Sequence, residues 1–383
     1  MSQIIEQPNP KRKQLQTKLQ KEFNNKKTYQ EKLITIYYTL LTSQKYYLKY
    51  KNNEILNDNN LNNLIEKLNK IENINDFKFF LFVQNNIIAP LNSKHINLSF
   101  ENEYINKFLK YYNILKNQEQ NNQHIANFLN SNQLENLLTE LSLIEEIDNP
   151  KFITFLEKNI LTVISKEKLQ EITKETEENC NIVFEKDTII ITLHSFSKKH
   201  LKMDQEKFKK LSLDLKKDNY QNIIIDIRKN GGGTDEYFNL FNIFSNKKII
   251  HNMQWFNLFQ EEYEQNQWTA IEQGTNEQYN IFLLIDDKVF SSADSFARLC
   301  QHSKFATIIG EPTLGEGYGS NPLTISLKTK NPLILTFPID APINKYGNID
   351  YENYYNTKPH IFCNSNQAMN TAKTIIEQNN KTK

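Results

Sequence analysis

Apolar residues follow two different periods along the chain, and the change comes near residue 180. In the earlier part they recur every three or four positions, as between Leu61 and Ile71, which is typical of an amphipathic helix. In the later part, short and mainly apolar runs at 223–227 and 281–285 alternate with helical patterns. Such runs are typical of buried parallel strands whose faces are covered by helices. The pattern therefore predicts a helical first part and an α/β second part.

The glycines divide the chain at a similar place. All nine lie between Gly231 and Gly347, and the first 230 residues contain none. Loops that need the backbone freedom of glycine are thus concentrated in the second part. We predict an all-helical N-terminal domain over residues 1–178 and a separate α/β domain over residues 179–383.

Composition and charge exclude several classes of function. The 383 residues carry a net charge of +1, which gives no electrostatic reason to expect a nucleic-acid partner. Three widely spaced cysteines form no disulfide or zinc pattern and suit a reducing compartment. No segment has the length of a bilayer span, and the N-terminus lacks a signal-like apolar region. We expect a cytoplasmic protein with no membrane partner, no metal and no organic cofactor; its oligomeric state stays open.

A serine stands where a predicted strand gives way to a predicted helix. Ser292 follows the apolar run 281–285, and the apolar residues after it have helical spacing. One interpretation is a helix cap, because serine is favoured at that position. The other is a nucleophile, because the free N–H groups of a helix's first turn can hold a developing oxyanion. The spacing alone leaves both interpretations open.

Two glycine-rich stretches lie on either side of this serine in the sequence. Gly231–Gly233 follow the predicted strand 223–227, and a second group lies within 310–319. Three bare residues suit a tight turn, or a loop whose backbone N–H groups approach a reacting atom. The second stretch lacks the GK[ST] sequence of a phosphate-binding loop and opens no helix. We therefore exclude nucleotide binding.

Taken in order, these stretches resemble the signature motifs of the tail-specific, or C-terminal-processing, serine peptidases of family S41. The motif DLRxNxGG corresponds to residues 226–232, SAxE to 292–295 and GExTxGxG to 310–317. The resemblance extends from Ile182 to about Ile376 and keeps the order and spacing of the motifs. It implies an α/β core of the kind that Clp-type proteases (ClpP) and crotonases share.

The resemblance also implies roles for individual residues. Ser292 would be the nucleophile, and the backbone N–H groups of Gly232 and Ala293 would form the oxyanion hole. The chemistry of the two loops agrees, since bare glycine backbone and a helix N-terminus both supply donors. The implied activity is hydrolysis of extended or unstructured polypeptide through an acyl-enzyme, without a cofactor.

The general base is the point at which the chain departs from the family. Where many members have a lysine, this sequence has Glu316. Tricorn-type members use a histidine from the first core strand and a late glutamate, which correspond most nearly to His194 and Glu352. Histidine suits base work near neutral pH. The alternatives are a His194 packed at a strand end, a Glu352 exposed on a loop, and a site without a base.

Two other functions are alternatives to the peptidase. Glu316, together with Ser295 in place of the last residue of SAxE, motivates a catalytically inactive fold that serves as a protein-binding or scaffolding module. A crotonase-like acyl-CoA enzyme would also use a backbone oxyanion hole, but the order and identity of the serine motifs oppose it. Because a fold does not fix a function, the inactive module stays beside the peptidase as an alternative.

Overall fold

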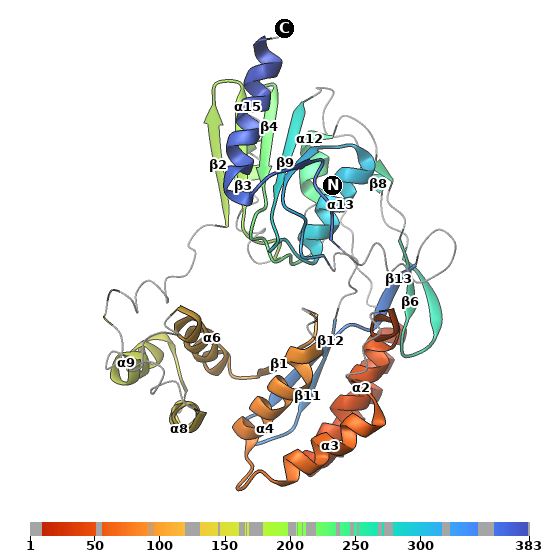
Figure 1. Ribbon diagram of the computed structural model, residues 1–383, viewed down its shortest axis with the longest axis vertical. Helices are drawn as coiled ribbons and strands as arrows, with labels where there is room; N and C mark the ends of the chain where they lie inside the picture. Colours follow the sequence, from red (N-terminus) through yellow and green to blue (C-terminus); the bar gives the residue numbers. More distant parts are fainter. Residues whose placement is uncertain are drawn as a thin grey trace. The chain divides into compact units, whose positions relative to one another are not determined.

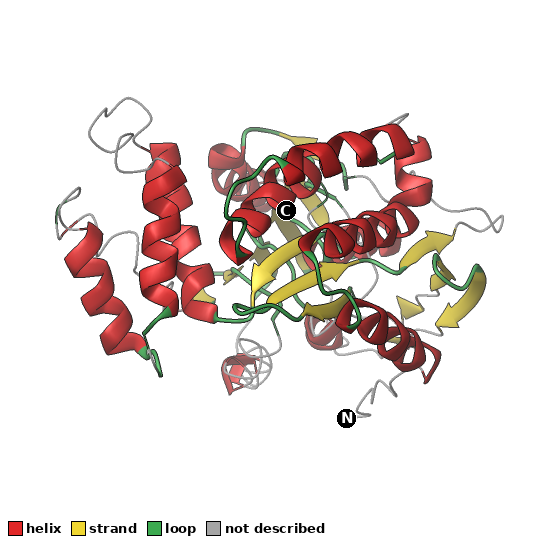
Figure 2. Cartoon of the chain, turned by 90° about the horizontal axis from the view of Figure 1, so that it is seen from below, coloured by secondary structure: helices red, strands yellow, loops and turns green. Residues whose placement is uncertain are grey.

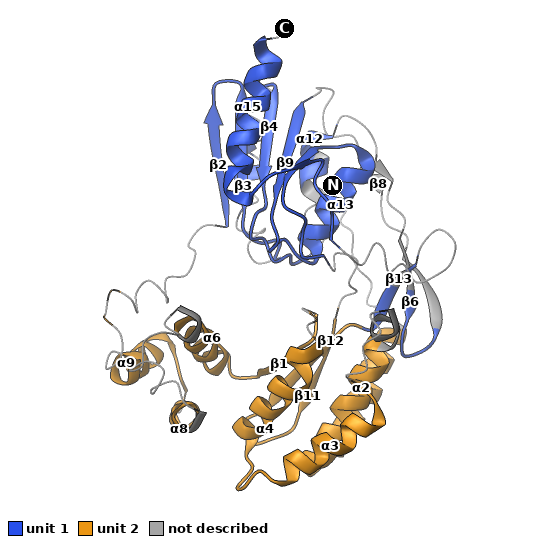
Figure 3. Cartoon of the chain, viewed as in Figure 1, with its two compact units in different colours: residues 1–4, 176–321, 339–383 blue, residues 5–175, 322–338 orange. Residues whose placement is uncertain are grey.

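The computed structural model divides the chain into two compact units (Figure 3). The first unit takes in residues 1–4, 176–321 and 339–383, and the second takes in residues 5–175 and 322–338. The structure describes residues 10–50, 56–91, 93, 95–118, 131–144, 146–160, 165, 167, 179–197, 204, 206–208, 210–211, 220–234, 238–245, 249–250, 253–266, 270–271, 279–315, 322–343 and 356–381.

A six-stranded sheet in the order β14-β10-β9-β4-β3-β2 organises the first unit. All neighbouring strands are parallel except β2, which pairs antiparallel with β3. This mostly parallel sheet confirms the predicted α/β class. The strands are β2 (Cys180–Glu185), β3 (Thr188–Leu193), β4 (Asn222–Asp226), β9 (Asn280–Ile285), β10 (Thr307–Gly310) and β14 (Ile361–Phe362).

Helices cover the two faces of this sheet (Figure 1). The helices α12 (Phe238–Phe244) and α13 (Ser292–Ser303) pack on one face, and α15 (Ala368–Lys381) packs on the other. Successive residues of β9 serve opposite faces: Leu283 lies in the α13 core and Leu284 in the α15 core. Burial on both sides explains why this strand is apolar at every position from Ile281 to Ile285 rather than at every second one.

Shorter elements complete the first unit. Two of its small sheets have the strand orders β13-β6-β7 and β5-β8. A short 3-10 helix, η3, precedes α15. The bounds are β5 (Ile249–Ile250), β6 (Met253–Asn257), β7 (Glu262–Asn266), β8 (Ala270–Ile271), β13 (Asp340–Ile343) and η3 (Ser365–Gln367).

We expect the three cysteines to differ sharply toward an alkylating reagent. Cys180 and Cys300 are buried in the core, whereas Cys363 is only partly buried. Burial also raises the pKa of the Cys300 thiol well above its ordinary value, which lowers its reactive thiolate fraction. Iodoacetamide should therefore modify Cys363 in the native protein and reach the other two only after denaturation, as read by mass spectrometry. Fast native modification of Cys300 would contradict the packing of α13 on the sheet.

The second unit is mostly helical, as predicted. Figure 2 shows the helices of the whole chain in red. Among the described residues of the chain, no helix combines the length and apolar character needed to cross a membrane. The helices of this unit are α1 (Pro10–Asn24), α2 (Tyr29–Tyr50), α3 (Asp58–Asn69), α4 (Asp76–Val83), the π-helix η1 (Gln84–Ile88), α5 (Ala89–Leu91), α6 (Glu103–Gln118), α8 (Ser131–Ser142) and α9 (Asn149–Ile160).

This unit also contains a three-stranded sheet that the helical pattern did not indicate. Its strand order is β1-β12-β11, and both pairings are antiparallel. β1 (Asn97–Phe100) comes from the first half of the chain, whereas β11 (Leu323–Leu327) and β12 (Leu333–Phe337) form a hairpin from the second half. The unit is therefore not all-helical, and the hairpin lies outside the unit to which the predicted boundaries assigned it. As independently folding domains, residues 1–178 and 179–383 stay a prediction.

The helix α1 covers the outer edge of β11, which holds the hairpin in this unit. Side chains one helical turn apart donate to carbonyl oxygens two strand residues apart. The spacings match, because four helix residues and two strand residues each advance by about 6 Å. The pairs are Arg12 with Pro322 at 2.9 Å, Gln16 with Thr324 at 3.1 Å and Gln20 with Ser326 at 2.8 Å.

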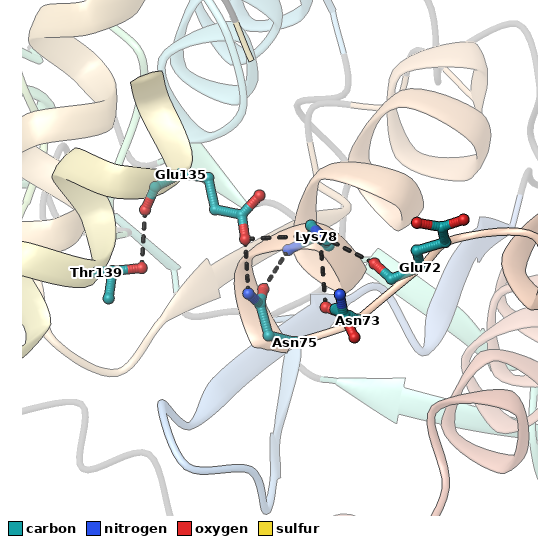
Figure 4. A network of polar contacts seen from close by, with 6 residues as sticks. All are labelled: Glu72, Asn73, Asn75, Lys78, Glu135 and Thr139. Carbon is teal, nitrogen blue, oxygen red and sulfur yellow. Dashed lines mark hydrogen bonds and ion pairs between the residues drawn. The ribbon is translucent and has the colours of Figure 1, made fainter. Parts of the chain in front are cut away.

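A polar network fixes the start of α4 against α8 (Figure 4). The Asn75 side chain caps α4 by accepting the Lys78 N–H at 2.9 Å, and its amide donates to Glu135 Oε1 at 2.8 Å. Lys78 Nζ donates to the Glu72 carbonyl at 2.9 Å and lies 3.8 Å from Glu135 Oε1. The cap satisfies a backbone N–H group in the first turn of α4. These residues therefore stabilise the contact between α4 and α8.

Candidate active site

The triple-glycine loop and the start of α13 meet in the first unit. A Cβ built on Gly232 would lie 2.8 Å from Ser291 Cβ, 2.9 Å from the Ser292 nitrogen and 2.7 Å from the Phe290 oxygen. Gly232 also has φ +89°, which favours glycine over residues that carry a side chain. The glycine loop and the residues before α13, about 60 positions apart in the sequence, are therefore in van der Waals contact. Only glycine can occupy position 232 at this contact.

Asn230 holds this loop in place. It is fully buried, its amide donates to the Leu193 carbonyl at 3.0 Å, and its side-chain oxygen accepts the Gly232 N–H at 2.8 Å. Its own carbonyl accepts the Phe290 N–H at 3.1 Å. One side chain and its backbone thus tie the end of β3, the glycine loop and the residue before Ser291. This explains why an asparagine follows the predicted strand.

The two adjacent serines have different environments. Ser291 precedes α13 with φ 56° and ψ −129°, and its N–H donates to the Gly315 carbonyl at 3.1 Å. Such a backbone costs about 1–3 kcal/mol and is characteristic of functional sites. Ser291 is partly exposed, whereas Ser292 is only 7% exposed and its Oγ is buried without a hydrogen-bond partner among the described residues. Of the two hydroxyl groups, that of Ser292 is closed to an approaching substrate.

The two N–H groups predicted to form the oxyanion hole already have protein acceptors. The Gly232 N–H donates to Asn230 Oδ1 at 2.8 Å, and the Ala293 N–H donates to the Phe290 carbonyl at 3.1 Å. The sequence could not reveal these bonds, because both depend on how the loops turn.

The next peptide group of the glycine loop is oriented differently. The Gly232 carbonyl accepts the Phe196 N–H at 2.9 Å. A trans peptide directs its N–H opposite to its C=O, so the Gly233 N–H faces away from Phe196. The loop has Phe196 on one side, against Gly233, and Ser291 on the other, against Gly232. The motif DLRxNxGG, written out over its eight positions, also ends at Gly233 rather than at Gly232.

The structure does not identify which of the three candidate residues is the general base. His194 follows β3 directly, and its side chain is exposed. Among the described residues, no hydrogen bond or ion pair links that side chain to Ser291 or Ser292. Glu316 and Glu352 lie outside the described residues. The identity of the base therefore stays a prediction.

Sequence reasoning missed a buried carboxylate next to the serines. Asp294, in the first turn of α13, is fully buried and accepts hydrogen bonds from Thr313, Thr357 and Arg298. A one-residue shift of the SAxE register would have found it, because it puts Ser291 first and the acidic Asp294 last. The departure that Ser295 represented disappears in that register.

An ion pair at the end of β4 anchors the C-terminal segment. Arg228 Nε and Nη2 donate to Asp226, while Nη1 donates to the Ser365 carbonyl at 2.6 Å. Hydrogen bonding to Asp226 raises the pKa of the Arg228 guanidinium above its ordinary value. These motif residues thus fix the start of the segment that leads into α15.

Comparison with known families agrees with this geometry. Residues 187–361 match peptidase family S41. This part of the chain belongs to peptidase family S41. The matched segment contains both glycine-rich stretches, both serines and Asp294. The assignment to a tricorn-like subgroup stays a prediction.

The solved structures that are similar to this chain share little sequence with it. A putative peptidase from Parabacteroides merdae is 12% identical, with 93% of this chain and 97% of that chain covered and a TM-score of 0.48. A putative S41 protease from Bacteroides fragilis is 13% identical, with 54% and 59% covered and a TM-score of 0.41. A lipoprotein from Streptococcus agalactiae is 13% identical, with 72% and 96% covered and a TM-score of 0.40. None of the curated proteins compared with the chain matches it.

Proposed function

We propose that this chain is a serine peptidase whose nucleophile is Ser291, the neighbour of the serine first predicted. The contact between Gly232 and Ser291 carries this proposal, because it brings a donor-rich loop against a hydroxyl. A nucleophile must also reach its substrate. The partial exposure of Ser291 supports that role, whereas the buried Oγ of Ser292 argues against it.

The oxyanion hole in this proposal consists of the Ser292 and Gly233 N–H groups. The Ser292 nitrogen lies 2.9 Å from the position that a Gly232 side chain would take, so it borders the space beside Ser291. The orientation of the Gly232–Gly233 peptide supports Gly233 as the second donor. Backbone donors of this kind are fixed before the reaction and need not reorganise as charge develops.

The reaction would proceed through an acyl-enzyme. Ser291 Oγ attacks the peptide carbonyl while a base takes its proton, and the amine leaves with a proton returned by the same group. Water then attacks the ester and releases the new carboxyl terminus and the free serine. An extended or unstructured polypeptide suits such a site, because it can satisfy its own backbone groups by pairing along a strand.

Active-site labelling tests the nucleophile directly. A fluorophosphonate should form an adduct with the native protein, and casein turnover should fall in proportion to labelling. Trypsin cleavage after Lys288 and Arg298 releases residues 289–298 with both serines. Fragment ions of that peptide should place the adduct on Ser291. An adduct on Ser292 restores the first prediction, and no adduct together with no turnover at any pH supports the inactive binding module.

His194 is the described candidate for the base, and we expect His194→Ala to lower kcat by roughly 10²–10⁴-fold. Its place directly after β3, next to the strand that leads into the glycine loop, supports the role. His302→Ala is the matched control, since His302 is another exposed histidine of the same unit at the far end of α13. Steady-state turnover of a peptide substrate measures both. Equal activity of the two variants would leave Glu316 or Glu352 as the base.

A further inference from the structure

The buried carboxylate of Asp294 joins three segments that border the serine. Its Oδ1 accepts from Thr313 Oγ1 at 2.5 Å, from Thr357 Oγ1 at 2.6 Å and from the Thr357 N–H at 3.1 Å. Its Oδ2 accepts from Arg298 Nη2 at 3.1 Å, one turn further along α13. The Asp294 side chain has no exposed surface, and that of Arg298 is 5% exposed. We call Asp294, Thr313, Thr357 and Arg298 the aspartate clamp.

The two threonine partners of the carboxylate lie on segments that lead to the site. Thr313 stands two residues before Gly315, whose carbonyl accepts the Ser291 N–H. Thr357 stands five residues after Glu352, and Gly315 directly precedes Glu316. The threonines also bond to each other, because the Thr357 N–H donates to Thr313 Oγ1 at 2.7 Å and the Thr313 N–H donates to the Thr357 carbonyl at 3.1 Å.

The donors around residue 294 suit a carboxylate better than an amide. Four donor contacts converge on its two oxygens, and an ionised carboxylate offers acceptors alone. The negative charge also lies in the first turn of α13, where the helix dipole favours it, and opposite the Arg298 cation. An asparagine of the same shape would turn its NH₂ group toward donors on one side or the other.

We infer that Asp294 is a positioning residue for catalysis, which sets Ser291 through Thr313 and Gly315. This inference rests on the proposed function and extends it. The clamp holds Thr313, two residues before the Gly315 carbonyl that accepts the N–H of Ser291, so it limits movement of the segment against which the positive-φ backbone of Ser291 rests.

Asp294→Asn separates this role from simple stabilisation. Because a misplacement of about 1 Å can cost about 100-fold in rate, we expect fluorophosphonate labelling of Ser291 to slow by about that factor. The KM for a peptide substrate should stay unchanged, since the clamp does not touch substrate. Amide hydrogen exchange should rise selectively in peptides that contain residues 313–315.

Asp204→Asn is the matched control. Asp204 is a buried carboxylate of the same unit that accepts from the Asn179 amide and lies 3.8 Å from Lys207. Within the described part of the chain it forms no bond to the serine loop. Its variant should lose thermal stability without losing labelling rate. Equal slowing in both variants, compared at a temperature where both are folded, would show that Asp294 is merely structural and would overturn the inference.

A substitution at Thr313 supplies a second test that leaves the buried charge in place. Thr313→Val keeps the shape and removes the hydroxyl, so labelling should slow as in Asp294→Asn, and Thr313→Ser should restore it. The double variant Asp294→Asn/Thr313→Val should be no slower than Asp294→Asn alone, because both changes break one connection. Additive effects would contradict the clamp. If the wild type forms no fluorophosphonate adduct, the proposed function fails. Unchanged amide hydrogen exchange at residues 313–315 in Thr313→Val would separately refute the role of the aspartate clamp.

Discussion

Replacing Ser291 by alanine is expected to lower kcat/KM for a peptide substrate by roughly 10⁴-fold or more, because loss of the attacking hydroxyl leaves only binding and the oxyanion hole. Ser292→Ala should change it by less than about tenfold. The Ser292 Oγ is buried without a described partner, so its removal leaves no group unsatisfied. Steady-state kinetics of the two variants at equal concentrations of folded protein measure the contrast.

The reverse result would return the nucleophile to Ser292. That outcome would require the Ser292 side chain to turn out of its buried position before it could meet a substrate. If neither variant lost activity, the turnover would come from a contaminant, and the inactive binding module would become the better reading of the fold.

Replacing Gly232 by alanine should reduce fluorophosphonate labelling and peptide turnover by roughly 10²–10³-fold, the loss typical of a damaged oxyanion hole. The new Cβ would meet the backbone at Phe290 and Ser292 within 3 Å, and φ +89° is strained for alanine. The glycine loop and the start of α13 must therefore move apart. The experiment compares labelling rate and thermal midpoint with those of the wild type.

Gly231→Ala is the control for this experiment. Nothing lies within 4 Å of a Cβ at Gly231, so the adjacent substitution in the same loop should leave labelling within about twofold of wild type. If Gly232→Ala labelled as fast as Gly231→Ala, the loop would not border the nucleophile, and the site would need to be sought elsewhere.

Local pattern was enough for much of the fold. The apolar run 281–285 became β9, and the helical spacing after it became α13, which begins at Ser292 as the pattern indicated. The predicted helix with apolar residues from Leu61 onward became α3, where Leu61, Leu64 and Leu68 are buried. These elements follow from periodicity because each buries one face or one strand against the core.

Pairing between distant segments was beyond that pattern. β1, at residues 97–100, pairs with β12, at residues 333–337, and no local period encodes such a partner. The hairpin lies in the part of the chain that the predicted boundaries assign to the second domain, because the sequence does not show that α1 covers its edge. The same limit hid Asp294, whose partner Thr357 stands 63 residues away.

The sequence by itself determined the α/β class and the order of the motifs, and its resemblance to family S41 implied that a glycine loop approaches a serine-bearing helix start. Tertiary structure decided which of two adjacent serines is accessible, which N–H groups already have acceptors and what Asp294 binds. The physical reason is that residue type and period report what must be buried. The direction of a hydroxyl or an amide at a turn depends on backbone angles and on bonds to residues far along the chain.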